Sequence, residues 1–443
     1  MKNRIPAFVV CMLITFGSAI GQSPWSLSDC IDYAHANNLR VKQAKYDATV
    51  ASNNHFQSKM NILPDLNASA GRYYNFGHTV DPQTNSFSDD DFMSDSYEIG
   101  TSLSLFAGLR NYNNIKANEF QALSSLQDVE KEKIEISFEI SRAYLSILFS
   151  KELLEVAISQ RDVTTLQVDR TDKLVVAGNA ARGDLLEILA QKAAEDLNVT
   201  NAQNSLNLAY LNLTQILDLD SVAGFEVFVP DTVVPNFAEQ IVDVATVYND
   251  GLGFLPHVKG AEYSLLATER YYSIQKGRLS PTLSITSNWG TGFSENVEKQ
   301  LGLSYSEQFK NLDYQNLFIT LRVPLFNRWQ VKNDISNTKI SVLSAENTLD
   351  LTKQQLYKEI QQAYNDAVSA KEKYISADEA VKSYKEAFGY TEQKFEVGIV
   401  NSVEYNISKN NFIKAESDLL QAKYEYIFSL KILDFYRGIP LSL

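Results

Sequence analysis

Residues with the types and spacing that chemistry requires are few in this chain. Its four histidines show no metal-ligand spacing: His35, His55, His78 and His257. No phosphate-binding loop, nucleophile elbow or zinc pattern is present, and the isolated Gly251-Leu252-Gly253 is typical of a turn. An outer-membrane hydrolase would need a serine, a histidine and an acid on one strand face, and we find no such set. The sequence therefore predicts no enzyme, no cofactor and no metal site.

Two polar loops are the remaining places where a ligand could bind. Residues 81–95 include the acidic run Asp89-Asp90-Asp91, and residues 294–313 are polar with mixed charge. Carboxylates at this density could bind divalent cations, but runs of like charge are usually solvated. We therefore expect solvated loops at both places.

The composition of the whole chain limits its function class. The 443 residues include 40 basic and 54 acidic side chains, for a net charge of -14. This balance argues against a nucleic-acid partner, which would need a basic surface. Proline (10) and glycine (19) are scarce, which favours long uninterrupted elements.

The N-terminal residues 1–21 have the pattern of a secretory signal peptide. Lys2 and Arg4 precede an apolar stretch at 7–16, and small residues follow at Ala19-Ile20-Gly21. Cleavage would remove Cys11 and leave Cys30 as the single thiol, so no intramolecular disulfide is expected. Beyond the signal we find no run of about 18 apolar residues, so this exported chain could enter a membrane only as a barrel.

The mature chain repeats itself at an offset of about 220 residues. The repeat is visible in pairs that keep one order: Leu105-Phe106 with Leu325-Phe326, Glu139-Ile140 with Glu359-Ile360, and Gly178 with Gly398. We expect two structural repeats at 22–220 and 241–443. The linker at 221–240 contains one short apolar run, 225–229, which could form a small strand beside the helices.

Each repeat is predicted to contain the same elements in the same order. A helical stretch comes first (27–60 and 241–276), then a strand after a proline (65–74 and 282–289), and then a second strand (97–105 and 317–325). Long helices follow at 109–176 and 332–395, each roughly 100 Å at 1.5 Å per residue. They break at Gly178 and Gly398 and continue over 183–219 and 403–436. The breaks are expected to be hairpin tips far from the strands.

The second strands alternate apolar and polar residues, which indicates one apolar and one polar face. Their length of about 9–11 residues suits a tilted strand in a bilayer. Four strands cannot close a barrel, and open edges are not tolerated in lipid. Three chains would supply about twelve strands, which is wide enough for a channel.

These features resemble the TolC family of outer-membrane export ducts over essentially the whole mature chain. The resemblance lies in Leu63-Pro64-Asp65-Leu66 with Ser280-Pro281-Thr282-Leu283, in the tips Val175–Asn179 and Glu396–Val400, and in the closing segment Ala415–Gly438. It implies a mainly α fold with a strand contribution: a trimeric twelve-stranded outer-membrane barrel, surrounded by lipid and continued by a helical periplasmic tube.

The same resemblance implies partners and site residues. A periplasmic adaptor protein would dock at the tips, and an inner-membrane pump of the RND or ABC class would supply energy. The docking positions would be Val176, Ala177, Gly178, Val397, Gly398 and Ile399. Asp184 and Glu404, six positions after the tip glycines, match family acids, and three chains would place six carboxylates there. Such a ring would favour cations and hold the tip nearly closed.

Some positions depart from the family pattern or have a simpler explanation. Val400 and Ile407 stand where the family often has a basic and a second acidic gate residue, so the family's gating bonds do not transfer. Asn401 and Glu404 also have capping-box spacing, and Asp184 near a helix start suits the helix dipole. Cap and gate are compatible roles, and both stay open.

The sequence therefore predicts a passive export duct for small toxic compounds. An exit duct for type I protein secretion is the closer alternative, because the pump selects the cargo. A barrel-anchored structural or adhesive coiled coil is the more distant alternative; it would show a continuous heptad seam and no duplicated strand hairpins.

Overall fold

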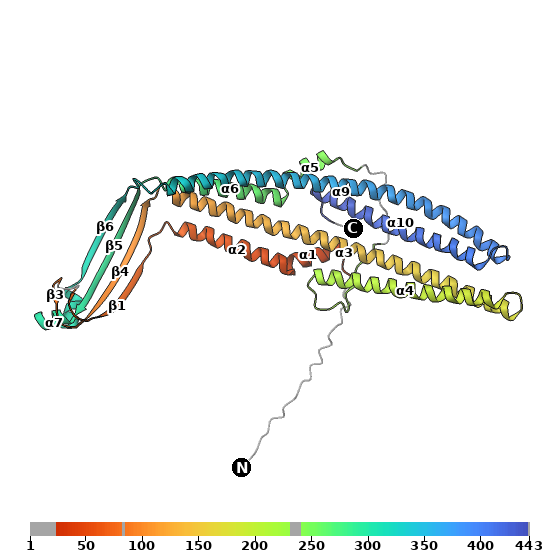
Figure 1. Ribbon diagram of the computed structural model, residues 1–443, viewed down its shortest axis with the longest axis horizontal. Coiled ribbons are helices and arrows are strands. Elements are labelled where there is room, and N and C mark those ends of the chain that lie inside the picture. The colour runs from red at the N-terminus through yellow and green to blue at the C-terminus, as the bar shows by residue number, and fades with distance from the viewer. Residues whose placement is uncertain (1–23, 82–84, 231–240, 442–443) are drawn as a thin grey trace, which may run out of the picture.

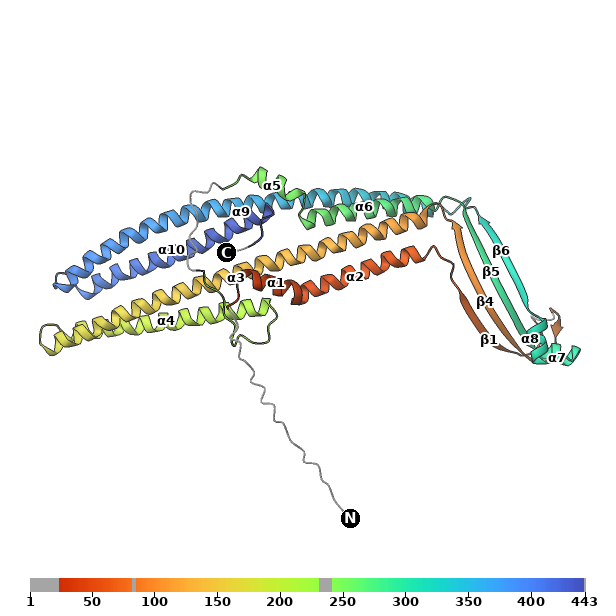
Figure 2. The ribbon, with the colours of Figure 1, turned by 180° about the vertical axis from the view of Figure 1, so that it is seen from behind.

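The structure is a computed structural model that describes residues 24–81, 85–230 and 241–441. The predicted signal peptide and residues 231–240 of the predicted linker lie outside these ranges. The described chain is elongated: a sheet lies at one end, and two helical hairpins extend to the other end (Figures 1 and 2). The strands and the hairpin tips are therefore at opposite ends, as the sequence predicts.

The two halves contain matching elements. The first half consists of α1 (Leu27–Asn37), α2 (Leu39–Met60), β1 (Asn67–Asn75), β2 (Thr79–Val80), β3 (Phe87–Ser88), β4 (Phe92–Phe106), α3 (Arg110–Val176) and α4 (Arg182–Ile216). The second consists of α5 (Val244–Leu252), α6 (Pro256–Gly277), β5 (Thr282–Ser294), α7 (Glu295–Leu301), α8 (Tyr305–Asn311), β6 (Tyr314–Arg322), α9 (Gln330–Glu396) and α10 (Ser402–Tyr436). Helices α3 and α9 have 67 residues each, and α4 and α10 have 35 each. The matching order and lengths confirm the internal duplication.

The long helices are the frame of the molecule. Helix α3 contains neither proline nor glycine, and α9 continues through its single Gly389, so nothing breaks them before their tips. Helices α2 and α4 pack along α3, while α6 and α10 pack along α9, and α6 also contacts α3. Each long helix is thus paired over its whole length, which a helix of roughly 100 Å needs to be stable.

A buried cluster at mid-length joins α1, α3, α4 and the linker. Tyr144 lies at its centre and donates hydrogen bonds to the carbonyl oxygens of Phe228 (2.5 Å) and Trp25 (3.1 Å). Val227 pairs with Trp25 as one isolated bridge, so the predicted small strand at 225–229 is only a single bridge. A second cluster joins α5, α6, α9 and α10 around Leu356 and its neighbours.

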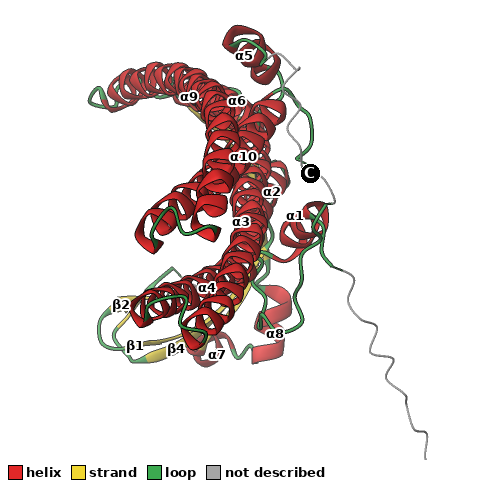
Figure 3. Ribbon diagram, turned by 90° about the vertical axis from the view of Figure 1, so that its right-hand side faces the viewer, coloured by secondary structure: helices red, strands yellow, loops and turns green. Residues whose placement is uncertain are grey.

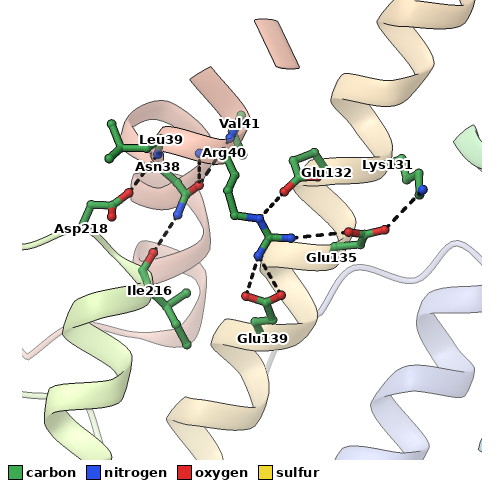
Figure 4. A network of polar contacts seen from close by, with 10 residues as sticks. All are labelled: Asn38, Leu39, Arg40, Val41, Lys131, Glu132, Glu135, Glu139, Ile216 and Asp218. Carbon is green, nitrogen blue, oxygen red and sulfur yellow. Dashed lines mark hydrogen bonds and ion pairs between the residues drawn. The ribbon is translucent and has the colours of Figure 1, made fainter. Parts of the chain in front are cut away.

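The helical stretch predicted at 27–60 consists of two helices, because the chain breaks at Asn38 (Figure 4). The Asn38 side chain accepts a hydrogen bond from the Arg40 N–H (2.9 Å) and donates one to the Ile216 carbonyl (2.9 Å). The Leu39 N–H donates to Asp218 (2.9 Å). The start of α2 is thereby fixed to the end of α4, so that the two helices lie in succession along α3.

An ion-pair network holds the same junction against α3. The guanidinium of Arg40 pairs with Glu132 (2.6 Å), Glu139 (2.9 Å) and Glu135 (3.5 Å) on successive turns of α3 (Figure 4).

In the second half, the helical stretch predicted at 241–276 is also divided into two helices, α5 and α6. Pro256 occupies the first position of α6, where its missing N–H costs nothing.

The main sheet has the strand order β1-β4-β5-β6, with every neighbour antiparallel. Strands β4 and β5 extend beyond their predicted ends because Ser94 pairs with Ser294. Register places most apolar side chains on one face, which we call the apolar face: Ile99, Leu103, Leu283, Ile285, Trp289, Leu317, Ile319 and Leu321. The other, polar face carries Ser96, Glu98, Ser102, Ser284, Asn288, Asn316, Thr320 and Arg322.

The two loops between strands are more ordered than the sequence predicts. Residues 81–95 include β3 and the start of β4, and Asp81 and Asp95 are buried, although Asp89-Asp90-Asp91 is exposed as expected. The predicted loop at 294–313 contains α7 and α8 instead. Within the described ranges, no helix has both the length and the apolar character to cross a membrane.

Candidate functional site at the hairpin tips

Both hairpins turn through the same backbone motif. The N–H of the third residue past the helix end bonds to the carbonyl five residues before it, and the glycine N–H bonds to the carbonyl three residues before it, as in a Schellman cap. The pairs are Asn179–Leu174 (2.8 Å) and Gly178–Val175 (3.0 Å) in the first tip, and Ile399–Lys394 (2.9 Å) and Gly398–Phe395 (3.1 Å) in the second. The predicted hairpin tips are therefore confirmed as turns.

The two tip glycines are required by backbone geometry. Gly178 has a φ of 77° and Gly398 a φ of 78°, a left-handed conformation that strains other residues. Apolar side chains beside them point into solvent: Val176 is 81% exposed, Val397 70% and Ile399 72%. Exposed apolar side chains at both tips form a surface that a partner could cover.

The two predicted acids have different surroundings. The Asp184 carboxylate accepts a hydrogen bond from the Ala181 N–H (3.1 Å) at the start of α4. In α10 the N-cap Asn401 side chain accepts the bond from the Glu404 N–H (2.9 Å), while the side chain of Glu404 is exposed. Asp184 therefore serves as a helix cap, and only the Asn401 half of the predicted Asn401–Glu404 capping box is present.

Direct contacts join the two hairpins just above the tips. Arg170 on α3 pairs with Glu396 on α9 (2.8 Å). The Gln167 side chain donates to the hydroxyl of Tyr405 on α10 (2.7 Å), and the Ser402 hydroxyl donates to Glu187 on α4. Burial raises the pKa of Tyr405 above its usual range, so this hydroxyl stays protonated.

A groove of about 650 Å³ lies between the tips. Asp184, Val397, Gly398, Ile399 and Val400 line it. Glu404 and Ile407 are outside this lining and are exposed. The structure therefore brings one predicted acid and three predicted docking residues into a single groove.

A buried ion pair fixes the hairpins farther from the tips. Lys409 on α10 and Glu195 on α4 lie 2.8 Å apart, with side chains 1% and 4% exposed. The Lys409 ammonium also donates to the Thr164 hydroxyl and the Gln160 carbonyl on α3. The second carboxylate oxygen of Glu195 has no hydrogen-bond partner in the part of the chain that the structure describes. Lys409 thus connects three helices at one point.

No pattern in the sequence predicts these contacts between the hairpins. Gln167 and Tyr405 are 238 residues apart, and Lys409 lies in a polar stretch that resembles an ordinary helix surface. No group of three or more histidine, cysteine, aspartate or glutamate side chains with metal-binding geometry occurs among the described residues. The tip groove and its contacts are therefore the candidate site.

Known proteins are similar to this chain in sequence. The family model described as Outer membrane efflux protein matches residues 30–218 and again 248–438. The chain is 22% identical to Outer membrane protein TolC of Vibrio cholerae serotype O1, covering 97% of this chain and 94% of that protein. It is 20% identical to Proteases secretion protein PrtF of Dickeya chrysanthemi, covering 96% and 90%.

A solved structure agrees with these sequence matches. The CmeC outer membrane channel of Campylobacter jejuni superposes with a TM-score of 0.78 at 16% identity, covering 93% of this chain and 85% of that one. This superposition confirms the predicted fold class. The family match and the outer-membrane relatives confirm the predicted location in the outer membrane. With two matched ranges that include most of its length, the chain belongs to the outer membrane efflux protein family, whose members are channels.

Proposed function

We propose that three copies of this chain form one continuous duct through the outer membrane and into the periplasm. The observation that carries this proposal is the open sheet. Strands β1 and β6 are its two edges, and all nine residues of β6 are exposed. Unpaired strand edges are not tolerated in lipid, so β6 of one chain would pair with β1 of the next. Three sheets then give about twelve strands and a lumen.

The polar face of the sheet would line this lumen. Glu98, Asn288 and Thr320 lie on that face, whereas Ile285 and Ile319 lie on the apolar face. Transmembrane barrels place apolar side chains toward lipid and polar ones toward water. A wet, polar lumen lets solutes pass without any bond being made, so transport through the duct would be passive.

The hairpin tips would receive a periplasmic adaptor protein that connects the duct to an inner-membrane pump. Val176, Ala177 and Gly178 form one tip, and Val397, Gly398 and Ile399 form the other. Their exposed apolar side chains and the groove between them support this assignment. The pump, of the RND or the ABC class, would supply the energy.

The same region would act as the gate. Contacts such as Arg170–Glu396 and Gln167–Tyr405 hold the hairpins together above the tip, so an adaptor that binds the groove could loosen them. They would replace the family's gating bonds, which Val400 and Ile407 cannot form. Asp184 and Glu404 from three chains would add a ring of negative charge that favours cations.

Efflux of small toxic compounds is the first candidate for the cargo. Secretion of polypeptides is the second, because PrtF, which matches nearly the whole chain, is named as a protease secretion protein. The duct geometry is compatible with either cargo, since the pump makes the choice.

The partner proposal is tested by photo-crosslinking in cells from Ile399, followed by mass spectrometry of the captured proteins. We expect an adaptor and its pump, and the pump class then identifies the cargo class. Leu126, which is also exposed but lies toward the sheet end of α3, is the matched control and should not capture the adaptor. Capture of only the chain's own copies from Ile399 would refute the docking assignment.

The docking residues are tested further by Gly398→Trp, which should abolish export while leaving trimers intact. Ile399→Arg is a companion that does not alter a left-handed residue, and Gly389→Trp within α9 is the control. Persistent export with both tip variants would show that the tip is wrongly assigned.

The acidic ring is tested by Asp184→Asn combined with Glu404→Gln. In planar bilayers we expect higher single-channel conductance and weaker cation preference than in the parent channel. Glu386→Gln, an exposed acid of α9 away from the tip turn, should change neither property. Unchanged conductance in the double variant would remove these acids from the gate.

A further inference from the structure

The segment between β5 and β6 packs against the apolar face of the sheet. The hydroxyl of Tyr97 lies 2.6 Å from that of Tyr305, and the ring of Tyr97 contacts Phe309 edge-on. Tyr305 also contacts the Phe293 ring, with ring centres 4.9 Å apart, and Thr291 donates to the Phe309 carbonyl (2.8 Å). Tyr97, Thr291 and Phe293 share a face with Ile99 and Trp289, so α8 lies on the apolar face.

The end-on view supports this placement. In Figure 3, α8 lies on the convex side of the curved helical layer, as α1 does, whereas β2 lies on the opposite side. In a barrel the apolar face points away from the lumen. Helix α8 is therefore outside the barrel wall and does not cover its mouth.

The height of α8 along the barrel wall follows from the length of strand β5. Phe293 is about ten residues beyond Leu283 on β5, or roughly 33 Å of strand. At a tilt of about 40° this corresponds to about 25 Å of height, which is the usual height of the apolar band of an outer-membrane barrel. Helix α8 thus lies at the upper limit of that band, where lipid headgroups begin.

The side chains of this segment suit that depth. Leu301 is 68% exposed, Tyr305 40% and Phe309 38%. Tyrosine is enriched at membrane–water interfaces, and leucine and phenylalanine are typical of the buried face of helices that lie at the boundary between headgroups and acyl chains. Residues 295–311 carry three glutamates and two lysines, and Lys299 pairs with Glu295 (3.3 Å), so charge alone would not attract this segment to an anionic surface. Tyr305 of α8 also hydrogen-bonds to the Asp95 carboxylate, which pairs with Arg72 and is 1% exposed, on a face otherwise directed at lipid.

The Gln308 side chain of α8 accepts a hydrogen bond from the Ser294 N–H (2.8 Å) and donates one to the Ser294 carbonyl (3.1 Å), which ties the start of α7 to α8. We propose that α7 and α8, residues 295–311, form a collar that lies in the headgroup layer of the outer leaflet, with Leu301 in contact with lipid. The occupant of this exposed surface is the bilayer, since the surface continues the lipid-facing wall formed by Ile319 and its neighbours. The collar leaves the channel mouth uncovered by this segment and fixes the depth of the barrel in the membrane. The inference rests on the barrel assembly proposed above.

Spin labelling of the full-length protein in proteoliposomes, with Cys11 replaced by serine, tests the collar. Single cysteines replace Leu301, Ile319, Thr320 and Phe87, which represent the collar, the apolar face, the polar face and the β2–β3 hairpin. Native Cys30 is fully buried, and burial raises its pKa to about 12, so it should stay unlabelled. The readout is the relaxation of each nitroxide by oxygen, which concentrates in lipid, and by a water-soluble nickel chelate.

For Leu301→Cys we expect an oxygen-to-nickel ratio between those of Ile319→Cys and Phe87→Cys, and well above that of Thr320→Cys. A ratio equal to that of Phe87→Cys would place the segment in water and overturn the collar. Protection from both reagents would show that a neighbouring chain covers it, which also overturns the proposal. If Ile319→Cys itself fails to report lipid, then the barrel assembly is wrong and the collar with it.

Discussion

Replacing Lys409 with methionine removes the charge that compensates Glu195 inside the helical body. Both side chains are almost fully buried, so the carboxylate would stay in a region of low polarity without its partner. Breaking a buried pair from one side typically costs about 3–5 kcal/mol, because the remaining charge is uncompensated. At about 1.4 kcal/mol per factor of ten, local opening of α4 and α10 should become about 140- to 3,700-fold more frequent.

Hydrogen exchange measured by mass spectrometry gives this quantity segment by segment, because amide exchange reports local opening. Peptides from α4 and α10 around Glu195 and Lys409 should lose protection, while peptides of α2 and α6 at the sheet end should not. The combined variant Lys409→Met with Glu195→Leu should recover most of the loss, since buried pairs can often be replaced by apolar residues.

The matched control is Lys192→Met, which breaks the Lys192–Asp196 pair (2.8 Å) on the same helix α4. That pair is partly exposed and should be worth less than about 1 kcal/mol. If Lys409→Met and Lys192→Met lower protection equally, or if the double variant is worse than either single one, then the buried pair does not hold the hairpins together.

Three further predictions concern the tip, a cap and a histidine. Arg170→Gln should raise the leak conductance in planar bilayers with almost no change in melting temperature, because its pair with Glu396 is half exposed; unchanged conductance would exclude this pair from the gate. Asn38→Ala should cost about 1–2 kcal/mol, since α2 loses its cap, and faster exchange at the start of α2 would show it; normal protection there would contradict it. Burial lowers the pKa of His35, so its contribution to stability is complete above about pH 6.5 and is lost as the pH falls below it. His35→Gln should therefore flatten the loss of urea resistance between pH 7.5 and 5, and equal losses in both proteins would refute the assignment.

The elements that the sequence predicts well are those determined by local pattern. Helix α3 was expected at 109–176 and runs from Arg110 to Val176, and α9 was expected at 332–395 and runs from Gln330 to Glu396. The absence of proline and the glycines at 178 and 398 specify these lengths without any tertiary contact. The strands follow from period-two alternation in the same way.

The sequence does not predict the short helices, because their local sequence pattern is weak. Helices α7 and α8 have seven residues each, too few for a periodic pattern. Their caps were visible, however: Ser304 and Glu307 form a capping box with the S-x-x-E spacing. The sequence signal for the break at Asn38 is the asparagine itself, which is a common helix-capping residue. The Ile216 carbonyl to which its side chain donates is 178 residues away, so the sequence does not predict that contact.

The long helices, the tips and the two-faced strands follow from local sequence pattern, because each depends on residues close together in the chain, and the duplication follows from comparing the two halves. Which polar side chains meet depends instead on how the helices and strands pack. Lys409 resembles a surface lysine until the packing of α10 against α3 and α4 buries it beside Glu195. Likewise, whether the segment after β5 covers the channel mouth or the outer wall depends on which face of the sheet it packs against. Such contacts join residues hundreds of positions apart, and the free energy that selects them comes from burial and pairing in the assembled fold.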